Sequence, residues 1–395
     1  MKTNNLIITI FFCLTFLIVS GQSWKVAWDK QLGNQKMDYF KDVIADINGG
    51  YTVLGSAYPK GSASYDLWLV RFNENGDTLW TKTLGTAFTD IPKRLLQASD
   101  GSYLLTGVSK EENSDLLFLI KTDTNGKEQW RKIFNDGSNY SGEDVVSFAD
   151  GDFLLVGSKS ADNINLKRWM VKLDKNGEVI WEKNFGDDFN GCCKSIRKLP
   201  DGGFAVTGQM AKAGQKDCNI WIARLNDNLD FLWDEQVSSP GMKVWPECMC
   251  CSPDSCFIVV GWQGNCMNDI NSDEPVFDFD LVLLKVDKTG NVVWNRNFDR
   301  EGSEGGNAIT LLPDGNFVVA GAKVTSFLGK TGPWMMMTDQ KGNLISETLI
   351  DMHFNNDQAI KVINSSDGGI IVIGPGVQDE KYSRSNGWIM KFTDI

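Results

Sequence analysis

The sequence has few residues of two kinds that many functional sites need. Its 395 residues include a single histidine, His353. Zinc sites with several imidazole ligands and catalytic sites with two histidines are therefore excluded. Basic residues are also in deficit, because 39 Lys and Arg stand against 51 Asp and Glu, for a net charge of −12. This charge argues against a protein that follows nucleic-acid phosphates or docks on an anionic membrane, so we expect no nucleic-acid partner.

Long apolar runs are missing after the first 21 residues. The run from Leu6 to Val19 follows a basic start and precedes small residues, and it is too short for a membrane span. This arrangement is typical of a secretory signal peptide. We predict that residues 1–21 are removed and that residues 22–395 form one secreted domain, extracellular or periplasmic. We expect this domain to be monomeric and not inserted in a membrane.

Tryptophan is abundant instead, with 14 residues, and most of them mark an internal repeat. Segment 174–181, Asp-Lys-Asn-Gly-Glu-Val-Ile-Trp, is one copy of a recurring phrase. Its tryptophan recurs at Trp28, Trp80, Trp130, Trp181, Trp233 and Trp294. A second phrase, Asp-Gly-Gly-aromatic, places its last residue at Tyr51, Tyr103, Phe153, Phe204, Phe257, Phe317 and, as a seventh copy, Ile370. A third position carries Trp68, Phe118, Trp169, Trp221, Val282, Trp334 and Trp388.

Seven copies of about 53 residues each are typical of propeller blades with four strands, A to D. In the third copy the pattern predicts strands at 143–148, 153–157, 168–173 and 178–185, with tight turns between A and B and between C and D. The fold class is therefore all-β, a seven-bladed β-propeller of four-stranded antiparallel blades. The seventh copy ends after its strand C, and segment 24–32 reads as a lone strand D. We predict that this N-terminal strand completes the last blade and closes the ring, which removes exposed sheet edges.

These phrases resemble the propeller repeats of exported bacterial proteins, which are related to quinoprotein-like propellers. The resemblance covers nearly all of segment 22–395. It implies the fold but no activity, because such repeats occur in adhesins, surface scaffolds and enzymes. The adjacent Cys192 and Cys193 are similar to a cysteine pair near the cofactor of quinoprotein dehydrogenases. The remaining residues show no matching calcium site, so we expect no cofactor and no metal.

The variable B–C and D–A loops lie on one face of a propeller, and this face is the predicted binding surface. Copy five differs most from the others. We expect its B–C loop to run from about Trp262 to Phe279. Two exposed indoles, Trp245 and Trp262, beside carboxylates such as Asp269 and Asp278 would suit a sugar. A longer loop without function is the alternative interpretation.

Eight cysteines remain after removal of the leader. They are Cys192, Cys193, Cys218, Cys248, Cys250, Cys251, Cys256 and Cys266. In an exported protein an even number favours disulfides, and Cys251 with Cys256 could bridge a hairpin. A soft metal site of thiolates and methionines is the less favoured alternative.

Catalytic residues are not marked by any motif, so only weak candidates can be named: His353, Glu247 and Tyr140. His353 could act as a general base, Tyr140 could serve a lyase, and Glu247 lies among acids and lysines at the starts of strands A, near the channel mouth. Our first hypothesis is a secreted propeller that binds a glycan or an extracellular surface partner through its D–A/B–C loop face. The alternative is a carbohydrate-active enzyme, a polysaccharide lyase or glycoside hydrolase, with its site on the same face.

Overall fold

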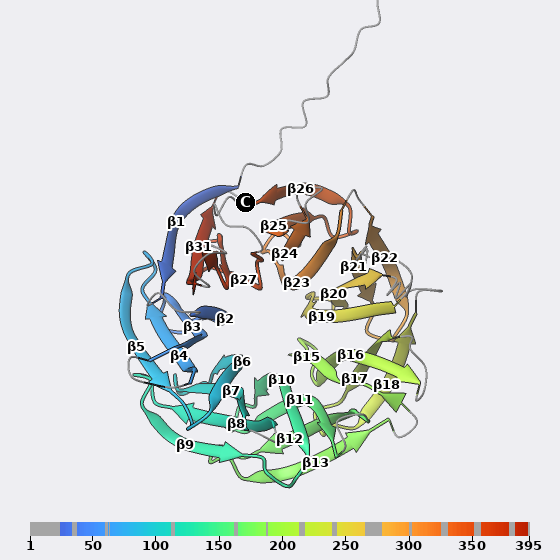
Figure 1. Cartoon of the computed structure of the whole chain (residues 1–395). Helices are drawn as coiled ribbons and strands as arrows, with labels where there is room; N and C mark the ends of the chain where they lie inside the picture. The colour runs from blue at the N-terminus through green and yellow to red at the C-terminus, as the bar shows by residue number, and fades with distance from the viewer. Residues whose placement is uncertain are drawn as a thin grey trace, which may run out of the picture.

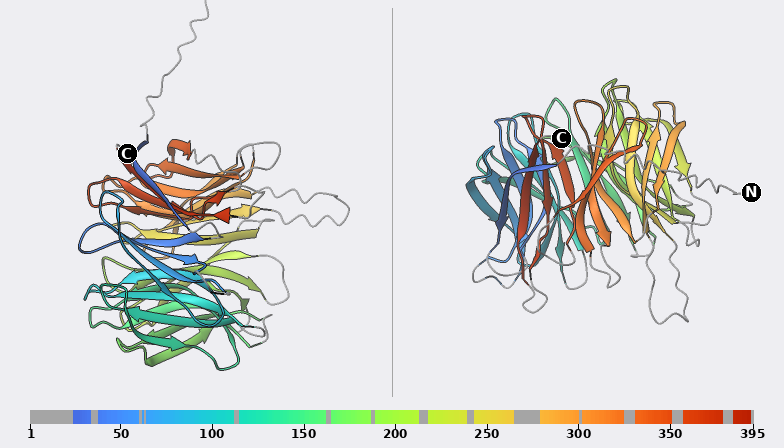
Figure 2. Two further views of the ribbon diagram at one scale, coloured as in Figure 1. Left: turned by 60° about the vertical axis from the view of Figure 1, so that its left-hand side comes forward. Right: turned by 90° about the horizontal axis from the view of Figure 1, so that it is seen from above.

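The computed structural model is an all-β ring of seven antiparallel sheets (Figures 1 and 2). It describes residues 24–33, 38–59, 62, 64–111, 115–161, 165–186, 189–212, 218–238, 243–264, 279–299, 302–324, 331–350, 357–378 and 384–393. The predicted signal peptide, residues 1–21, lies outside them. Within these ranges no helix is long and apolar enough to cross a membrane. The predicted seven-bladed propeller is confirmed.

Each blade runs from an inner strand A to an outer strand D. Blade one holds β2 (Tyr39–Ala45), β3 (Tyr51–Ala57), β4 (Asp66–Phe72) and β5 (Thr78–Leu84). Blade two holds β6 (Thr89–Gln97), β7 (Tyr103–Lys110), β8 (Asp115–Thr122) and β9 (Glu128–Ile133). Blade three holds β10 (Asn139–Ser147), β11 (Phe153–Ser160), β12 (Lys167–Leu173) and β13 (Val179–Phe185). Blade four holds β15 (Cys193–Lys198), β16 (Phe204–Lys212), β17 (Asn219–Leu225) and β18 (Phe231–Val237), with β14 (Phe189–Asn190) paired to β16.

The remaining blades follow the same order. Blade five holds β19 (Lys243–Cys251), β20 (Phe257–Gly264), β21 (Phe279–Val286) and β22 (Val292–Phe298). Blade six holds β23 (Glu304–Leu311), β24 (Phe317–Val324), β25 (Thr331–Thr338) and β26 (Leu344–Leu349). Blade seven holds β27 (Lys361–Asn364), β28 (Ile370–Gly374), β31 (Gly387–Thr393) and β1 (Lys25–Leu32), and β29 (Val377–Gln378) pairs with β30 (Arg384–Ser385) in its B–C loop.

The ring is closed by its N-terminal strand. Strand β1 pairs antiparallel with β31, from Lys25 opposite Thr393 to Leu32 opposite Gly387. Figure 1 shows β1, in blue, as the outer strand beside the red strands of blade seven. The prediction that segment 24–32 completes the last blade is therefore confirmed.

The hydrophobic core lies between the blades. Seven clusters of buried side chains fill the seven contacts between adjacent sheets. Strand B begins with at least five buried residues in every blade and is buried throughout in β3, because both of its faces contact neighbouring sheets. Full burial of a Val, Leu or Phe contributes about 1.5–3 kcal/mol, so these clusters are the main source of stability.

In six of the seven blades, a tryptophan in strand D contacts the next blade; blade six has Ser346 at this position. The indole of Trp130 donates a hydrogen bond to the Lys175 carbonyl in the C–D turn of blade three, at 3.1 Å. Trp28 and Trp233 make the equivalent bonds to Glu74 and Lys288. The turn glycine lies against the ring, and a Cβ at Gly177 would stand 2.9 Å from Trp130. Each of these tryptophans contacts the C–D turn of the following blade. Their spacing in the sequence therefore equals the length of one blade.

The described cysteines do not form the disulfides that we predicted from the sequence. The seven cysteines in the described ranges are all free, so the predicted disulfides among them are not found, and Cys266 lies outside the described residues. The register explains the absence of the hairpin bridge. Cys251 stands opposite Phe257, whereas Cys256 lies in the turn with its Sγ 3.3 Å from an Asp254 oxygen.

Candidate functional site

The wall of the central channel is formed by the seven A strands, which Figure 1 shows as the innermost strands of the ring. Six of the seven contain a β-bulge near the D–A/B–C face, where the register with strand B shifts by one residue. A bulge adds an unpaired residue and redirects its side chain. Together with the matching residue of blade seven, the bulge residues form what we call the channel ring: Lys41, Lys93, Glu143, Lys194, Glu247, Asn307 and Ile360.

A glycine on strand B makes each bulge possible. Each strand B carries a glycine beside the bulge, and the strand A backbone approaches it closely. A Cβ at Gly157 would stand 1.7 Å from the Ser141 carbonyl oxygen, and one at Gly261 would stand 2.0 Å from that of Trp245. Any larger residue would push strand A away and move the bulge side chain with it. Gly55, Gly107, Gly208, Gly321 and Gly374 occupy the same position.

The channel ring encloses a pocket of about 290 Å³ at the channel mouth. Trp262, Arg94 and Gln358 complete its lining. The pocket therefore combines one aromatic ring, two carboxylates, two amides and four cationic groups. Such a mixture of an apolar surface with converging polar groups is typical of a small-ligand site.

Ion pairs compensate most of the charge in this pocket. The Lys93 Nζ donates to Glu143 Oε1 at 3.0 Å, and the Lys194 Nζ lies 4.0 Å from Glu247 Oε2. Burial opposes ionisation of Glu143, but Lys93 and Lys194 outweigh it and lower the pKa of this carboxyl to about 2. Glu143 is therefore ionised at neutral pH.

Lys41 differs from the other two lysines. It is solvent-exposed within the channel mouth, and among the described residues its ammonium group forms no hydrogen bond or ion pair. Enclosure by the channel walls, together with the neighbouring charges of Arg94 and Lys93, lowers the pKa of Lys41. Within the part of the chain that the structure describes, Lys41 is thus the cation of the channel ring without an ion-pair partner.

A buried charge network lies one residue deeper and supports the ring. Asp42 contacts Lys361 at 3.1 Å and Arg94 at 3.8 Å, and Asp144 contacts Arg94 at 3.3 Å. Asp144 also accepts a bond from Arg197 Nη1 at 2.6 Å. These residues come from blades one, two, three, four and seven, so the network links most of the ring across the channel.

The two carboxylates of this network also join neighbouring A strands directly. Asp42 accepts a hydrogen bond from the Leu95 backbone N–H, and Asp144 accepts one from that of Ile196. Arg94 Nε donates to the carbonyl of Glu143 at 2.9 Å. The deeper layer therefore holds the backbone that presents the channel ring.

The two indoles of blade five lie together but not as expected. Trp245 and Trp262 are opposite each other on β19 and β20, and their rings stack at 4.3 Å with Phe279 packed edge-on against Trp262. Both side chains are half-buried, which corrects the expectation of two exposed rings. Trp262 lies inside strand β20, so it does not begin the loop.

The other predicted site residues divide into three groups. Glu247 and Trp262 line the same pocket. Tyr140 does not, because it is buried against Phe134 and Trp169 and donates a hydrogen bond to Asp136 at 2.8 Å. Burial raises the pKa of Tyr140 to about 12, which makes it a poor base. His353, Asp269 and Asp278 lie outside the described residues.

Asn307 and Gln358 are lining residues that the sequence analysis did not identify. The Asn307 side chain donates to Gln358 Oε1 at 3.1 Å. The signal was available in principle for Asn307, which occupies the same place in its copy as a lysine or glutamate elsewhere, whereas Gln358 is equivalent to Tyr39 and Ser141 and has no such counterpart. Among the described residues no group of three or more His, Cys, Asp or Glu side chains is arranged to hold a metal ion.

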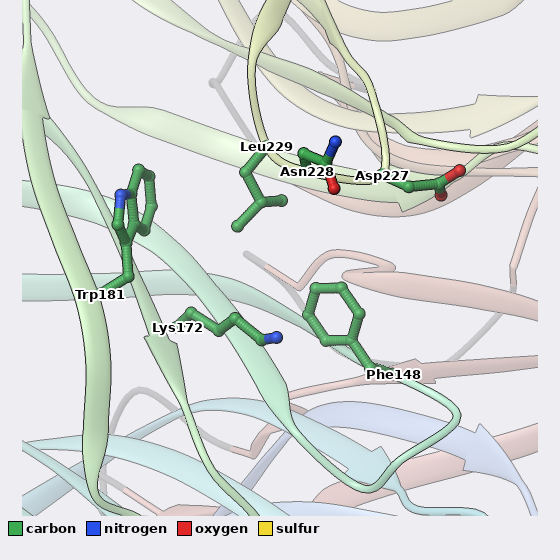
Figure 3. Close-up of a pocket in the computed structure, with 6 residues that line it drawn as sticks. All are labelled: Phe148, Lys172, Trp181, Asp227, Asn228 and Leu229. Carbon is green, nitrogen blue, oxygen red and sulfur yellow. The ribbon is translucent and has the colours of Figure 1, made fainter.

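A second hollow, of about 270 Å³, lies between the turns on the opposite face. Figure 3 shows Lys172 between Trp181 and Phe148, below Leu229. Lys172 is already paired with Asp152 at 3.0 Å and lies over the Phe148 ring. The hollow is built from the same contact that Trp28, Trp130 and Trp233 make with the next turn, so it is a weaker candidate than the channel mouth.

No protein-family model and no curated protein matches the chain. Solved structures do match it in shape. A polysaccharide lyase described as an ulvan lyase of family PL25 aligns with a TM-score of 0.57 and 10% identity, covering 91% of this chain and 95% of that one. BBS1N in complex with ARL6DN aligns with a TM-score of 0.51 and 12% identity, covering 93% and 96%. At these identities the likeness shows the propeller fold alone.

Proposed function

We propose that the chain is an exported propeller that binds a glycan at its channel mouth. One observation carries this proposal: the Trp262 ring and the polar side chains of Glu247, Asn307 and Gln358 line the same pocket. Aromatic faces stack on the CH groups of a sugar, and carboxylates and amides bind its hydroxyls. The signal-peptide pattern and the resemblance to exported bacterial propeller repeats support the extracellular setting.

Retardation of the mature chain in polysaccharide gels tests this proposal. We expect at least one neutral or uronate-containing polysaccharide to slow the parent protein. Trp262→Ala should reduce this retardation, because it removes the stacking surface from the pocket. Phe88→Ala is the matched control, since Phe88 is an exposed aromatic residue in the D–A loop before β6 and does not line the pocket.

Thermal unfolding of both variants separates a lost site from a lost fold. Trp262 also stacks on Trp245, so Trp262→Phe provides a variant that keeps an aromatic ring in place. Equal retardation of the parent and Trp262→Ala on a polymer that the parent binds would place the site elsewhere. No retardation on any polymer would contradict the glycan proposal and would favour an extracellular protein partner.

An enzyme at the same pocket is the second candidate. Glycoside hydrolases need a carboxylic acid that keeps its proton near neutral pH, and Glu143 does not meet this need because its pKa is lowered to about 2. A polysaccharide lyase needs a base, and the lowered pKa of Lys41 favours this alternative. New reducing ends with the ultraviolet absorbance of an unsaturated uronate would identify a lyase in the same samples. Polymer that stays intact would contradict it.

A further inference from the structure

The positive and negative charges of the channel ring do not balance. It contains three lysines and two glutamates, and its other two members, Asn307 and Ile360, are neutral. Glu143 is satisfied by Lys93 and by the Ser141 hydroxyl, and Glu247 lies nearest to Lys194. One positive charge therefore remains at the channel mouth, on Lys41.

The layer below does not neutralise this charge. Arg94 lines the same pocket and engages Asp144 and Asp42, while Lys361 engages Asp42. The carboxylates beneath the ring are thus already paired with cations of their own layer. Lys41 lines a pocket in which Arg94 and Lys93 each repel it more strongly than Glu143 or Glu247 attracts it, and a bound anion is favourable in such an environment.

The remaining lining is suited to the rest of a sugar. Asn307 and Gln358 supply amide groups, and Trp262 supplies an aromatic surface. Building on the proposed function, we propose that the pocket selects a glycan residue with a single negative charge and holds its anionic oxygens at Lys41. A uronate carboxylate and a sulfate ester share this chemistry. A singly charged group neutralises the excess charge of the ring, whereas an uncharged sugar leaves Lys41 without a partner.

Three probes of one sugar type test the inference: oligogalacturonate, the same oligomer with its carboxylates methyl-esterified, and a sulfated galactan oligosaccharide. Methyl esterification removes the charge and keeps the ring and hydroxyls. We expect the parent protein to bind at least one anionic probe about tenfold more tightly than the ester, as one charge-assisted hydrogen bond would give. The preferred anionic probe distinguishes carboxylate from sulfate. This preference should decrease as salt concentration rises.

Three variants locate the charge that is responsible. Lys41→Gln should abolish the preference by weakening binding of the anionic probe while binding of the ester stays unchanged, and Lys41→Arg should retain it. Lys183→Gln is the matched control, because Lys183 is exposed on the outer strand β13. An unchanged preference in Lys41→Gln, or equal binding of charged and esterified probes by the parent, would overturn the inference and leave glycan binding intact. Failure of all three probes, together with no retardation on any polysaccharide, would contradict the proposed function itself.

Discussion

The buried carboxylate of Asp144 offers a direct test of how the site is supported. Asp144 accepts hydrogen bonds from the Ser195 hydroxyl and the Ile196 N–H, both at 3.0 Å, in addition to its contacts with Arg94 and Arg197. The substitution Asp144→Asn keeps the size of the side chain and removes its charge. Two guanidinium groups then lose a buried anionic partner, and Arg94 is also the residue that holds the Glu143 carbonyl.

The expected cost follows from these contacts. Removing one partner of a buried ion pair costs about 3–5 kcal/mol. We take the lower value, about 3 kcal/mol, because Arg94 keeps its contact with Asp42 and the amide can still accept hydrogen bonds. For about 370 residues an unfolding entropy of about 2.1 cal/mol/K per residue gives about 0.8 kcal/mol/K, so the midpoint of thermal unfolding should fall by about 4 °C.

The effect should also depend on pH. Burial opposes the ionisation of Asp144, but Arg94 and Arg197 outweigh it and hold its pKa well below the usual range. A carboxyl with a depressed pKa in the folded state stabilises the protein above the unfolded pKa of about 3.9, and this stabilisation is lost as pH falls below that value. The difference between parent and Asp144→Asn should therefore be constant near neutral pH and should shrink in acid.

Calorimetry of the parent and the variant from neutral pH to acid measures both effects. Asp115→Asn is the control, since its ion pair with Lys110 is largely exposed and should contribute less than about 1 kcal/mol. A midpoint within 1 °C of the parent, or a difference between parent and variant that does not change with pH, would refute the conclusion that the buried network stabilises the ring.

Two further predictions concern Gly157, the glycine beside a bulge, and Cys248, which borders a second cavity. Gly157→Ala should cost about 3 kcal/mol, because its Cβ would meet the Ser141 carbonyl at 1.7 Å, whereas Gly368→Ala, at φ +87° with open space around it, should cost only about 1 kcal/mol; equal costs in denaturant unfolding would contradict the role of the close approach. Burial raises the pKa of Cys248, but Arg197, Lys361 and Arg94 outweigh it and lower that pKa below its ordinary value. Cys248 borders a cavity of about 380 Å³, so iodoacetamide should modify it faster than the other described cysteines at neutral pH, and Arg197→Gln should slow the reaction. Peptide mass spectrometry measures the rates, and faster labelling of any other described cysteine would contradict this expectation.

Much of the fold could be predicted because each repeat signal has a local physical cause. The turn glycine of most copies is needed for a positive φ, as at Gly177, and the preceding blade's strand D tryptophan packs against that turn. The unpaired strand at 24–32 could be matched to blade seven because a ring without it would leave a sheet edge open. These turns and tryptophans recur about every 50 residues, so the same structural signal can be recognised several times in one sequence.

The candidate site was predictable only in part, because its chemistry depends on contacts between blades. Glu247 and the lysines could be assigned to the starts of strands A. Which carboxylate pairs with which lysine depends on geometry across the ring, so the unpaired state of Lys41 had no signature in the sequence. Trp262 was expected in a loop because the copy-five insertion follows it, but strand β20 continues to Gly264. Tyr140 was a candidate because it carries a polar hydroxyl, but its ring packs in the core between blades two and three.

The pairing of a strand B glycine with a strand A bulge explains how a uniform scaffold can present a varied site. The glycine sets the close approach of the two backbones, and in six blades the bulge turns one extra side chain into the channel. The six bulge side chains contribute neither to the ladder nor to the clusters between blades, whereas Ile360 packs against the cluster between blades seven and one. The bulge residue can therefore be lysine, glutamate or asparagine, as it is here, without altering the fold. The scaffold and the ligand preference are thus encoded by different residues, and this separation is why a clear repeat predicts the propeller but not the ligand.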